Sequence, residues 1–399
     1  MPLGISEKCK NIQPSVTLAI DSRAKQLRAM GLDVIGFGAG EPDFDTPKYI
    51  KDAARDALDA GLTKYTPVAG TVELRNEIQA KLWRDNHLEY EMTDIIVSTG
   101  AKQCLFNALS AILDPGDEVL IPAPCWVSYP EMVAMAGGTA VLVNGSEEDN
   151  FVVAAEELEK KITPKTKALI INSPNNPTGC VIGSELLRKY ADLAVKYGFY
   201  VISDEIYEKL IYDGGKHVSI ASLGEDIKAQ TIVINGVSKS YAMTGWRIGY
   251  AAGPKNVIKA MTSFQSHTTS NANSIAQHAA AVALTNGEKF MHESFMEFTA
   301  RRNLMHQMLS SIDGLKCNLP SGAFYMMLNI SELIGKSVNG KVINGSDDFA
   351  SALLESKLVA VVPARAFGDD RFVRLSYATT REKIIVGMGR IAEFVKECE

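Results

Sequence analysis

The feature that most constrains the fold is an alternation of short apolar runs with amphipathic segments through the middle of the chain. Asp94–Val97 is typical of a buried strand, and Lys102–Leu113 follows it with apolar residues at the spacing of a helix. Strands that are apolar throughout and separated by helices are typical of a mainly parallel sheet covered on both faces. The sequence therefore predicts the α/β class. Further strands are predicted at Glu118–Ile121, Ala168–Ile171, Phe199–Ile202, Thr231–Ile234 and Ile248–Ala251.

Both ends of the chain follow this alternation less regularly. The N-terminal end holds one helix-like stretch, Val16–Met30, and a turn region rich in glycine and proline. Near the C-terminal end, helix-like segments alternate with shorter strand-like runs. We predict a large domain over residues 46–290, with a mostly parallel sheet and crossover helices. A smaller α+β domain is predicted from residues 1–45 and 291–399.

Composition excludes several classes of protein. The chain has 399 residues, 46% hydrophobic and 22% charged, which is the balance of an ordinary globular protein. A formal net charge of −6 argues against a nucleic-acid or anionic-membrane partner. No apolar run approaches the length of a membrane span, and early charged residues argue against an export signal.

Cysteine and histidine positions argue against a disulfide or metal framework. The six cysteines are scattered without a Cys-x-x-Cys pair, so we expect reduced thiols in a cytoplasmic protein. The six histidines lie far apart, without metal-ligand spacing, and no metal ligand is assigned.

Polar clusters follow four of the predicted strands, at the strand ends where ligands collect in open α/β sheets. Three begin at Ser98, Asn172 and Ser203, and the fourth holds Lys239 between two serines, with Arg247 eight positions later. A lysine just past a buried strand is a candidate amine nucleophile for a carbonyl compound. Hydroxyls and a guanidinium nearby suit an anion. Together they predict a phosphorylated aldehyde bound as a Schiff base, which describes pyridoxal 5'-phosphate.

The chemistry of this cofactor assigns roles to the clusters. A carboxylate must face the pyridine nitrogen and keep it protonated, and Asp204 can supply that charge. Asn176 and Tyr207 can hydrogen-bond the phenolic oxygen. Lys239, once displaced, can move a proton between substrate and cofactor. The predicted helix after Gly100 offers free N–H groups to the phosphate.

Each assignment has an ordinary alternative. Lys239 alone is typical of a solvated surface lysine, and Asp204 of a helix cap. Asn175–Gly179 is a good turn sequence without any ligand, and Trp126 fits a plain core. The glycines at positions 36, 38 and 40 suggest a dinucleotide-binding loop. We reject that interpretation because their spacing is wrong and the acidic residues that follow would repel a pyrophosphate.

An ordered set of motifs runs from about residue 14 almost to the C-terminus. It resembles the class I, fold-type I pyridoxal-phosphate aminotransferases, and most of all the bacterial aspartate aminotransferases of the Iβ subgroup. The stretches that carry the resemblance are Ala39–Pro47, Lys64–Gly70, Trp126–Glu131, Asn172–Gly179, Ser203–Glu208, Ser238–Gly249, Ser321–Tyr325 and Val373–Thr379.

The resemblance implies a set of site residues, with Lys239 as the catalytic Schiff-base lysine. Trp126 is expected to stack on the ring, and Arg374 to hold the substrate α-carboxylate. Tyr65 is expected to reach a neighbouring subunit's phosphate, which implies a homodimer with shared sites. The cofactor-binding residues implied are Tyr65, Gly100, Ala101, Lys102, Trp126, Asn176, Asp204, Tyr207, Ser238, Lys239 and Arg247. The substrate-binding residues implied are Thr17, Gly40, Lys102, Trp126, Asn176 and Arg374.

Substrate choice depends on the subgroup. No arginine occurs in Ser266–Gln277, where the animal-type enzymes carry the arginine for the distal carboxylate. In the Iβ subgroup, residues like Thr17 and Lys102 are associated with dicarboxylates, and members with both often also transaminate prephenate. Two departures are Ala101, where relatives usually have glycine, and Cys125, where an aromatic residue is common.

The resemblance implies reversible transamination of L-aspartate with 2-oxoglutarate, giving oxaloacetate and L-glutamate. The small domain is expected to close over the site when substrate binds. Prephenate use stays open, as do other reactions on the same scaffold: alanine or aromatic transamination, and carbon–sulfur β-elimination. A pyridoxal-phosphate-binding regulator is disfavoured, because about 14 residues precede the first motif and the net charge is negative.

Overall fold

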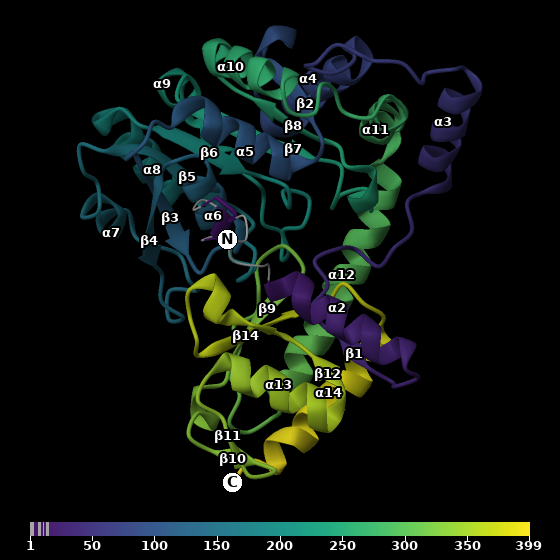
Figure 1. The fold of residues 1–399 in the computed structure, drawn as a ribbon, viewed down its shortest axis with the longest axis vertical. Coiled ribbons are helices and arrows are strands. Elements are labelled where there is room, and N and C mark those ends of the chain that lie inside the picture. The colour runs from purple at the N-terminus through teal and green to yellow at the C-terminus, as the bar shows by residue number, and fades with distance from the viewer. Residues whose placement is uncertain (1–3, 7–8, 11, 13–15) are drawn as a thin grey trace.

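The computed structural model describes residues 4–6, 9–10, 12 and 16–399. Figure 1 shows a sheet surrounded by helices in the upper half of the view, and elements from both ends of the chain in the lower half. The long helix α12 (Glu288–Leu309) runs between the two groups. The predicted α/β class is confirmed, with a mostly parallel sheet and crossover helices.

The large sheet has seven strands, and neighbouring strands are parallel except at β8, which is antiparallel to both β2 and β7. β7 and β8 are joined without a long helix, as antiparallel neighbours can be. All six predicted strands are present, and the edge strand β4 was not predicted. In spatial order the strands are β2 (Ile95–Ser98), β8 (Gly249–Ala252), β7 (Thr231–Gly236), β6 (Tyr200–Asp204), β5 (Thr166–Asn172), β3 (Glu118–Ala123) and β4 (Thr139–Asn144).

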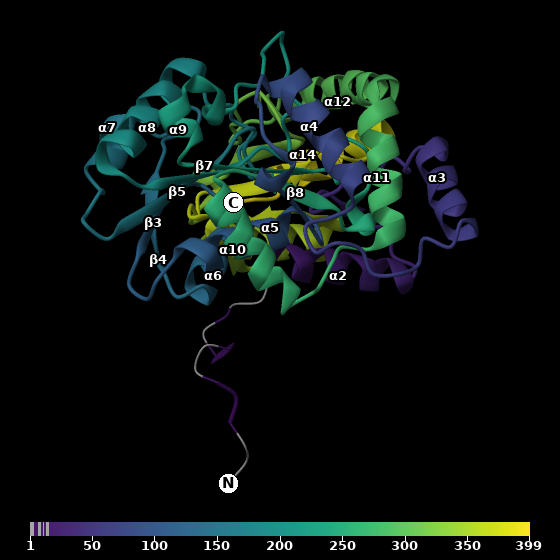
Figure 2. The ribbon, with the colours of Figure 1, turned by 90° about the horizontal axis from the view of Figure 1, so that it is seen from above.

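Helices cover both faces of this sheet (Figure 2), because successive strand residues point to opposite sides. Ile170 and Ile202 pack against α5, α6 and α10, whereas Leu169 and Val201 pack against α8 on the other face. The α-helices of this group are α3 (Lys48–Asp59), α4 (Val72–Asn86), α5 (Ala101–Ile112), α6 (Ser128–Met135), α7 (Ala155–Glu159), α8 (Ser184–Tyr197), α9 (Glu225–Lys228), α10 (Lys255–Ser266) and α11 (Ser274–Asn286).

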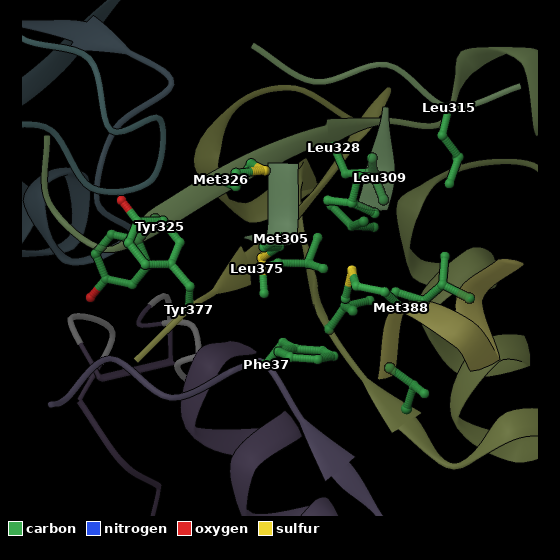
Figure 3. Packing of buried hydrophobic residues seen from close by; sticks show 14 of the residues in the cluster. Phe37, Met305, Leu309, Leu315, Tyr325, Met326, Leu328, Leu375, Tyr377 and Met388 are labelled. Atoms are coloured by element: carbon green, nitrogen blue, oxygen red, sulfur yellow. The ribbon is translucent and has the colours of Figure 1, made fainter. Parts of the chain in front are cut away.

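The second group joins the two ends of the chain around a core of its own (Figure 3). Strand β1 pairs in parallel with β12, and β13, β14 and β9 form an antiparallel sheet. Phe37, which follows β1, is fully buried beside Met388 of α14. These elements are α2 (Val16–Ala29), β1 (Ile35–Gly36), β9 (Tyr325–Asn329), β10 (Ser337–Val338), β11 (Lys341–Val342), α13 (Ser346–Lys357), β12 (Val359–Ala360), β13 (Val362–Pro363), β14 (Phe372–Ser376) and α14 (Arg381–Lys396).

Short 3-10 helices complete the structure, at Met92–Asp94, Ile220–Leu223, Thr244–Trp246, Ser331–Leu333 and Ala364–Phe367. Among the helices that the structure describes, none is both long and apolar enough to span a membrane.

Candidate active site

A cavity of about 440 Å³ lies where the two groups of elements meet. The large sheet contributes the carboxyl ends of β5 and β6 and the loop from β7 to β8, and α2, β9 and β14 close the other side. Twelve of the predicted site residues line it: Thr17, Gly40, Ala101, Lys102, Trp126, Asn176, Asp204, Tyr207, Ser238, Lys239, Arg247 and Arg374.

Two predicted site residues do not line the cavity. Gly100 lies directly before Ala101 and is the N-cap of α5. Tyr65 lies outside the cavity in this chain, and 91% of its surface is exposed.

Lys239 lies in the loop between β7 and β8 and reaches into the cavity. Its Nζ donates a hydrogen bond to the Gly40 backbone oxygen at 2.6 Å. Burial lowers the pKa of Lys239 to about 8, and Arg247 acts in the same direction while Glu41 opposes it. Close to neutral pH this amine can thus be both a base and an acid.

Asp204 ends β6 with its carboxylate held at both oxygens. Oδ2 accepts a hydrogen bond from the Tyr129 hydroxyl at 2.7 Å, and Oδ1 accepts one from the Ile206 N–H at 3.2 Å. Burial raises the pKa of Asp204 to about 6, although the Tyr129 hydrogen bond acts in the opposite direction. A cation placed against this carboxylate would keep it ionised.

Arg374 of β14 is almost fully buried beneath the cavity. It donates from Nη1 to Asn176 Oδ1 at 2.9 Å and from Nη2 to the Gly38 backbone oxygen at 2.8 Å. Its Nε is buried and has no partner among the described residues. An unpaired buried donor is costly, so a carboxylate from a ligand suits this guanidinium.

The first turn of α5 carries no side-chain cap, and Gly100 has a φ of +84°. A Cβ on Gly100 would lie 2.3 Å from Arg247 Nη2, so the guanidinium can lie against this turn only because residue 100 is glycine. The first helical residue, Ala101, fits without disturbing the helix. With the nearby hydroxyl of Ser238, the free N–H groups and the guanidinium suit a phosphate.

More basic than acidic residues line the cavity. Four line it without a carboxylate partner among the described residues: Lys102, Lys239, Arg247 and Arg374. Lys102 Nζ instead lies 4.6 Å from the centre of the Trp126 ring. Since cations in a partly desolvated cleft are normally paired, this surplus predicts a ligand with more than one negative group.

Several residues at the cavity were not predicted from the sequence. The hydroxyls of Tyr325 and Tyr207 share a hydrogen bond of 2.8 Å, and Glu41 accepts a hydrogen bond from Thr244 at 2.7 Å. Tyr129 holds Asp204, as described above. All three lie inside motifs that carry the family resemblance, but nothing local to the sequence shows what their side chains contact.

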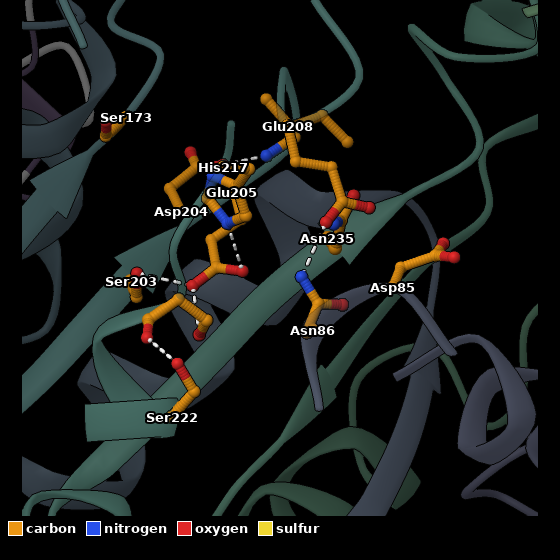
Figure 4. A network of polar contacts seen from close by, with 12 residues as sticks. Asp85, Asn86, Ser173, Ser203, Asp204, Glu205, Glu208, His217, Ser222 and Asn235 are labelled. Carbon is orange, nitrogen blue, oxygen red and sulfur yellow. Dashed lines mark hydrogen bonds and ion pairs between the residues drawn. The ribbon is translucent and has the colours of Figure 1, made fainter. Parts of the chain in front are cut away.

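Behind Asp204, a buried cluster holds the one group of described residues spaced to bind a metal: Glu205, Glu208 and His217 (Figure 4). Glu205 already accepts hydrogen bonds from Ser203 at 2.9 Å and Ser219 at 2.6 Å, and contacts His217 Nε2 at 2.9 Å. Glu208 pairs with Lys81 and accepts from Asn86 at 2.8 Å. We assign no metal, since the carboxylates are satisfied by protein groups.

A lysine and a buried carboxylate on one cavity wall, beside an uncapped helix start, suit a pyridoxal-phosphate-dependent enzyme, the class to which the class I aminotransferases belong. The family model for aminotransferases of class I and II matches residues 32–391. The chain belongs to this family and is an aminotransferase, as its sequence motifs predicted.

Curated relatives and solved structures agree over the whole chain. The aspartate aminotransferase of Geobacillus stearothermophilus is 48% identical over 392 residues, 98% of this chain and 99% of the relative. A probable aspartate/prephenate aminotransferase of Rhizobium leguminosarum bv. phaseoli is 49% identical, covering 99% of each chain. The structure of the aspartate aminotransferase from Rhizobium meliloti superposes with a TM-score of 0.96 at 43% identity, covering 100% of both chains. That of the Thermus thermophilus enzyme with maleate gives 0.93 at 45% identity, covering 98% of this chain and 99% of that one.

Proposed function

We propose that this protein catalyses the reversible transamination of L-aspartate with 2-oxoglutarate, giving oxaloacetate and L-glutamate. The observation that carries the proposal is the group of four cavity cations that have no carboxylate partner among the described residues. A phosphate and the two carboxylates of such a substrate would supply their counterions. The relatives named aspartate aminotransferase, and the maleate complex of the Thermus enzyme, support a dicarboxylate substrate.

Pyridoxal 5'-phosphate fits the residues present and, when bound, supplies the electron sink that stabilises charge at the substrate Cα. We propose that Lys239 binds its aldehyde, Asp204 pairs with its ring nitrogen, and Trp126 stacks on the ring. Asn176 and Tyr207 would hold the phenolic oxygen. The phosphate would bind Gly100, Ala101, Lys102, Ser238 and Arg247.

The substrate would be held at both ends. Arg374, with its unpartnered Nε, would bind the α-carboxylate, helped by Asn176, Trp126 and the Gly40 backbone. Thr17 and Lys102 would meet the distal carboxylate. Once the substrate amine has displaced Lys239 from the cofactor aldehyde, the freed Lys239 Nζ would take the proton from the substrate Cα. The lowered pKa of Lys239 leaves more of this amine unprotonated near neutral pH. Prephenate is a second candidate substrate, because Thr17 and Lys102 both line the cavity and relatives named aspartate/prephenate aminotransferase are equally similar.

We further propose a homodimer with shared sites, in which the exposed Tyr65 reaches the phosphate of the other subunit. Within one subunit, residues 1–45 and 291–399 would close over residues 46–290. The hydrogen bond from Lys239 to the Gly40 backbone oxygen supports this closure, because it joins the two groups of elements across the cavity. A cytoplasmic location is supported by the six cysteines, all of which lie in the described part of the chain and are free.

Profiling of amino donors and acceptors with the purified protein tests the proposal. Aspartate and 2-oxoglutarate should yield oxaloacetate and glutamate, and prephenate should be included among the acceptors. Lys239→Ala should abolish turnover and the absorption band of lysine-bound pyridoxal phosphate. The exposed Lys259→Ala on α10 is the matched control and should change neither. Pyruvate and ammonia without glutamate would contradict transamination, and a wild-type protein without that band would contradict the cofactor.

A further inference from the structure

Tyr129 contacts two of the residues proposed to hold the cofactor ring, although no motif assigned it a role. It is 1% exposed and lies in the first turn of α6. Its hydroxyl donates a hydrogen bond to Asp204 Oδ2 at 2.7 Å. Its ring meets that of Trp126 edge-on, with centroids 5.3 Å apart and planes 88° apart.

Backbone hydrogen bonds also hold Tyr129, Trp126 and Asp204 in place. The Tyr129 N–H donates to the Trp126 carbonyl oxygen at 3.0 Å, so the start of α6 sets the distance between the two rings. Asp204 is the last residue of β6, and its other oxygen is held by the Ile206 N–H. The Tyr129 hydroxyl is therefore the side-chain donor that ties the helix to the strand end.

The hydrogen bond from Tyr129 also favours the ionised form of Asp204. Burial disfavours the ionised carboxylate, and the groups that favour it are Tyr129, the Ile206 N–H and Lys239, while Glu205 disfavours it. A hydrogen bond to an ionised group is worth more than one between neutral groups. Tyr129 is one of two donors to this carboxylate among the described residues, so its removal would leave the carboxylate freer to turn away from the ring.

We propose that Tyr129 is a positioning residue, which aims Asp204 at the pyridine nitrogen of the cofactor and sets Trp126 against the ring. This inference rests on the proposed function, because it requires that pyridoxal phosphate bind in this cavity. It assigns Tyr129 no contact with the substrate, whose carboxylates are expected at Arg374 and Lys102.

The test is Tyr129→Phe, which keeps the ring and its contact with Trp126 and removes only the hydroxyl. We expect the dissociation constant of pyridoxal phosphate, from spectral titration of the apoprotein, to rise roughly tenfold to a hundredfold, as for one lost hydrogen bond to a charged group. We expect kcat to fall while KM for aspartate stays nearly constant. In an Asp204→Ala background the same substitution should have no further effect on cofactor affinity.

Tyr190→Phe is the matched control, because Tyr190 is also fully buried but donates to the backbone oxygen of Val153, away from the cavity. It should lower thermal stability as Tyr129→Phe does, without changing cofactor affinity. Unchanged cofactor affinity in Tyr129→Phe, an equal loss of cofactor affinity in both variants, or a full loss of affinity from Tyr129→Phe in the Asp204→Ala background would overturn the inference. If the wild-type protein bound no pyridoxal phosphate, the proposed function itself would fail.

Discussion

Arg374 shows how much a single side chain contributes to this site. Its guanidinium donates hydrogen bonds to Asn176 and to the Gly38 backbone oxygen. Its buried Nε has no hydrogen-bond partner among the described residues. A rigid fork of donors matches a carboxylate, whereas the ammonium of Lys102 is a point charge on a flexible chain. The two residues should therefore recognise different ends of a substrate, Arg374 by geometry and Lys102 by charge.

Lys102→Ala should weaken dicarboxylate use selectively. We expect kcat/KM for aspartate to fall roughly tenfold to a hundredfold, the cost of losing one charged partner, with a much smaller change for alanine. Arg374→Lys is the contrasting variant and should lower kcat/KM for both amino acids, since both have an α-carboxylate. Steady-state kinetics with the two donors measures this, at saturating pyridoxal phosphate because Lys102 is also proposed to contact its phosphate. Equal losses for aspartate and alanine in Lys102→Ala would show that Lys102 does not bind the distal carboxylate.

At the scale of elements, the start of α5 depends on one glycine. Gly100 has a positive φ, and its missing Cβ makes room for Arg247. Gly61 also has a positive φ, +73°, but nothing lies within 4 Å of where its Cβ would be. Gly61 is therefore a control in which a side chain is added at a positive φ without any loss of space.

Gly100→Ala should displace Arg247 and weaken phosphate binding. We expect the dissociation constant of pyridoxal phosphate to rise about tenfold, as for one weakened charged contact. Gly61→Ala should carry a strain cost of roughly 1–2 kcal/mol for a side chain added at positive φ, and should leave cofactor affinity unchanged. Thermal unfolding and spectral titration of both variants distinguish the two effects. Equal cofactor affinity in the two variants would exclude a role for the space at Gly100.

Most of what the sequence predicted about the fold concerns individual strands and helices. The six predicted strands are present because each is a continuous apolar run, as a strand buried on both faces must be. The reversed direction of β8 was not predicted, since an apolar run has no direction. The edge strand β4 was missed. It pairs with β3 alone, and its residues are mostly half-buried or exposed.

At the scale of the whole molecule, the buried network in Figure 4 joins α4 to the segment after β6. His217 faces Glu205 and Glu208, which raise its pKa, and Lys81, which lowers it. Burial also lowers the pKa of His217, yet the net shift is upward. A raised pKa in the folded state means that protonated His217 stabilises the fold below the ordinary histidine pKa, and that this is lost as pH rises through the raised value.

His217→Gln should therefore lower the unfolding temperature more at pH 6 than at pH 9. We expect the difference between the two conditions to be on the order of 2 °C. The exposed His292→Gln on α12 is the control and should show no such difference. Thermal unfolding of each variant against the wild-type protein at both pH values measures this. A larger destabilisation at pH 9 would mean that the neutral imidazole is the stabilising form.

The sequence by itself determined the α/β class and the strand-end clusters, because apolar runs and turns are local features of the chain. It also predicted the chemistry proposed for Lys239, since a reactive side chain is a local feature too. Lys239, Asp204 and Asn176 could be predicted together, since the carboxyl ends of neighbouring parallel strands meet at one edge. Only the tertiary structure decided that Lys239 donates a hydrogen bond to Gly40, that Arg374 donates one to Asn176, and that Tyr129 donates one to Asp204. Contacts between residues so far apart in sequence depend on how helices and strands pack, which no local pattern records.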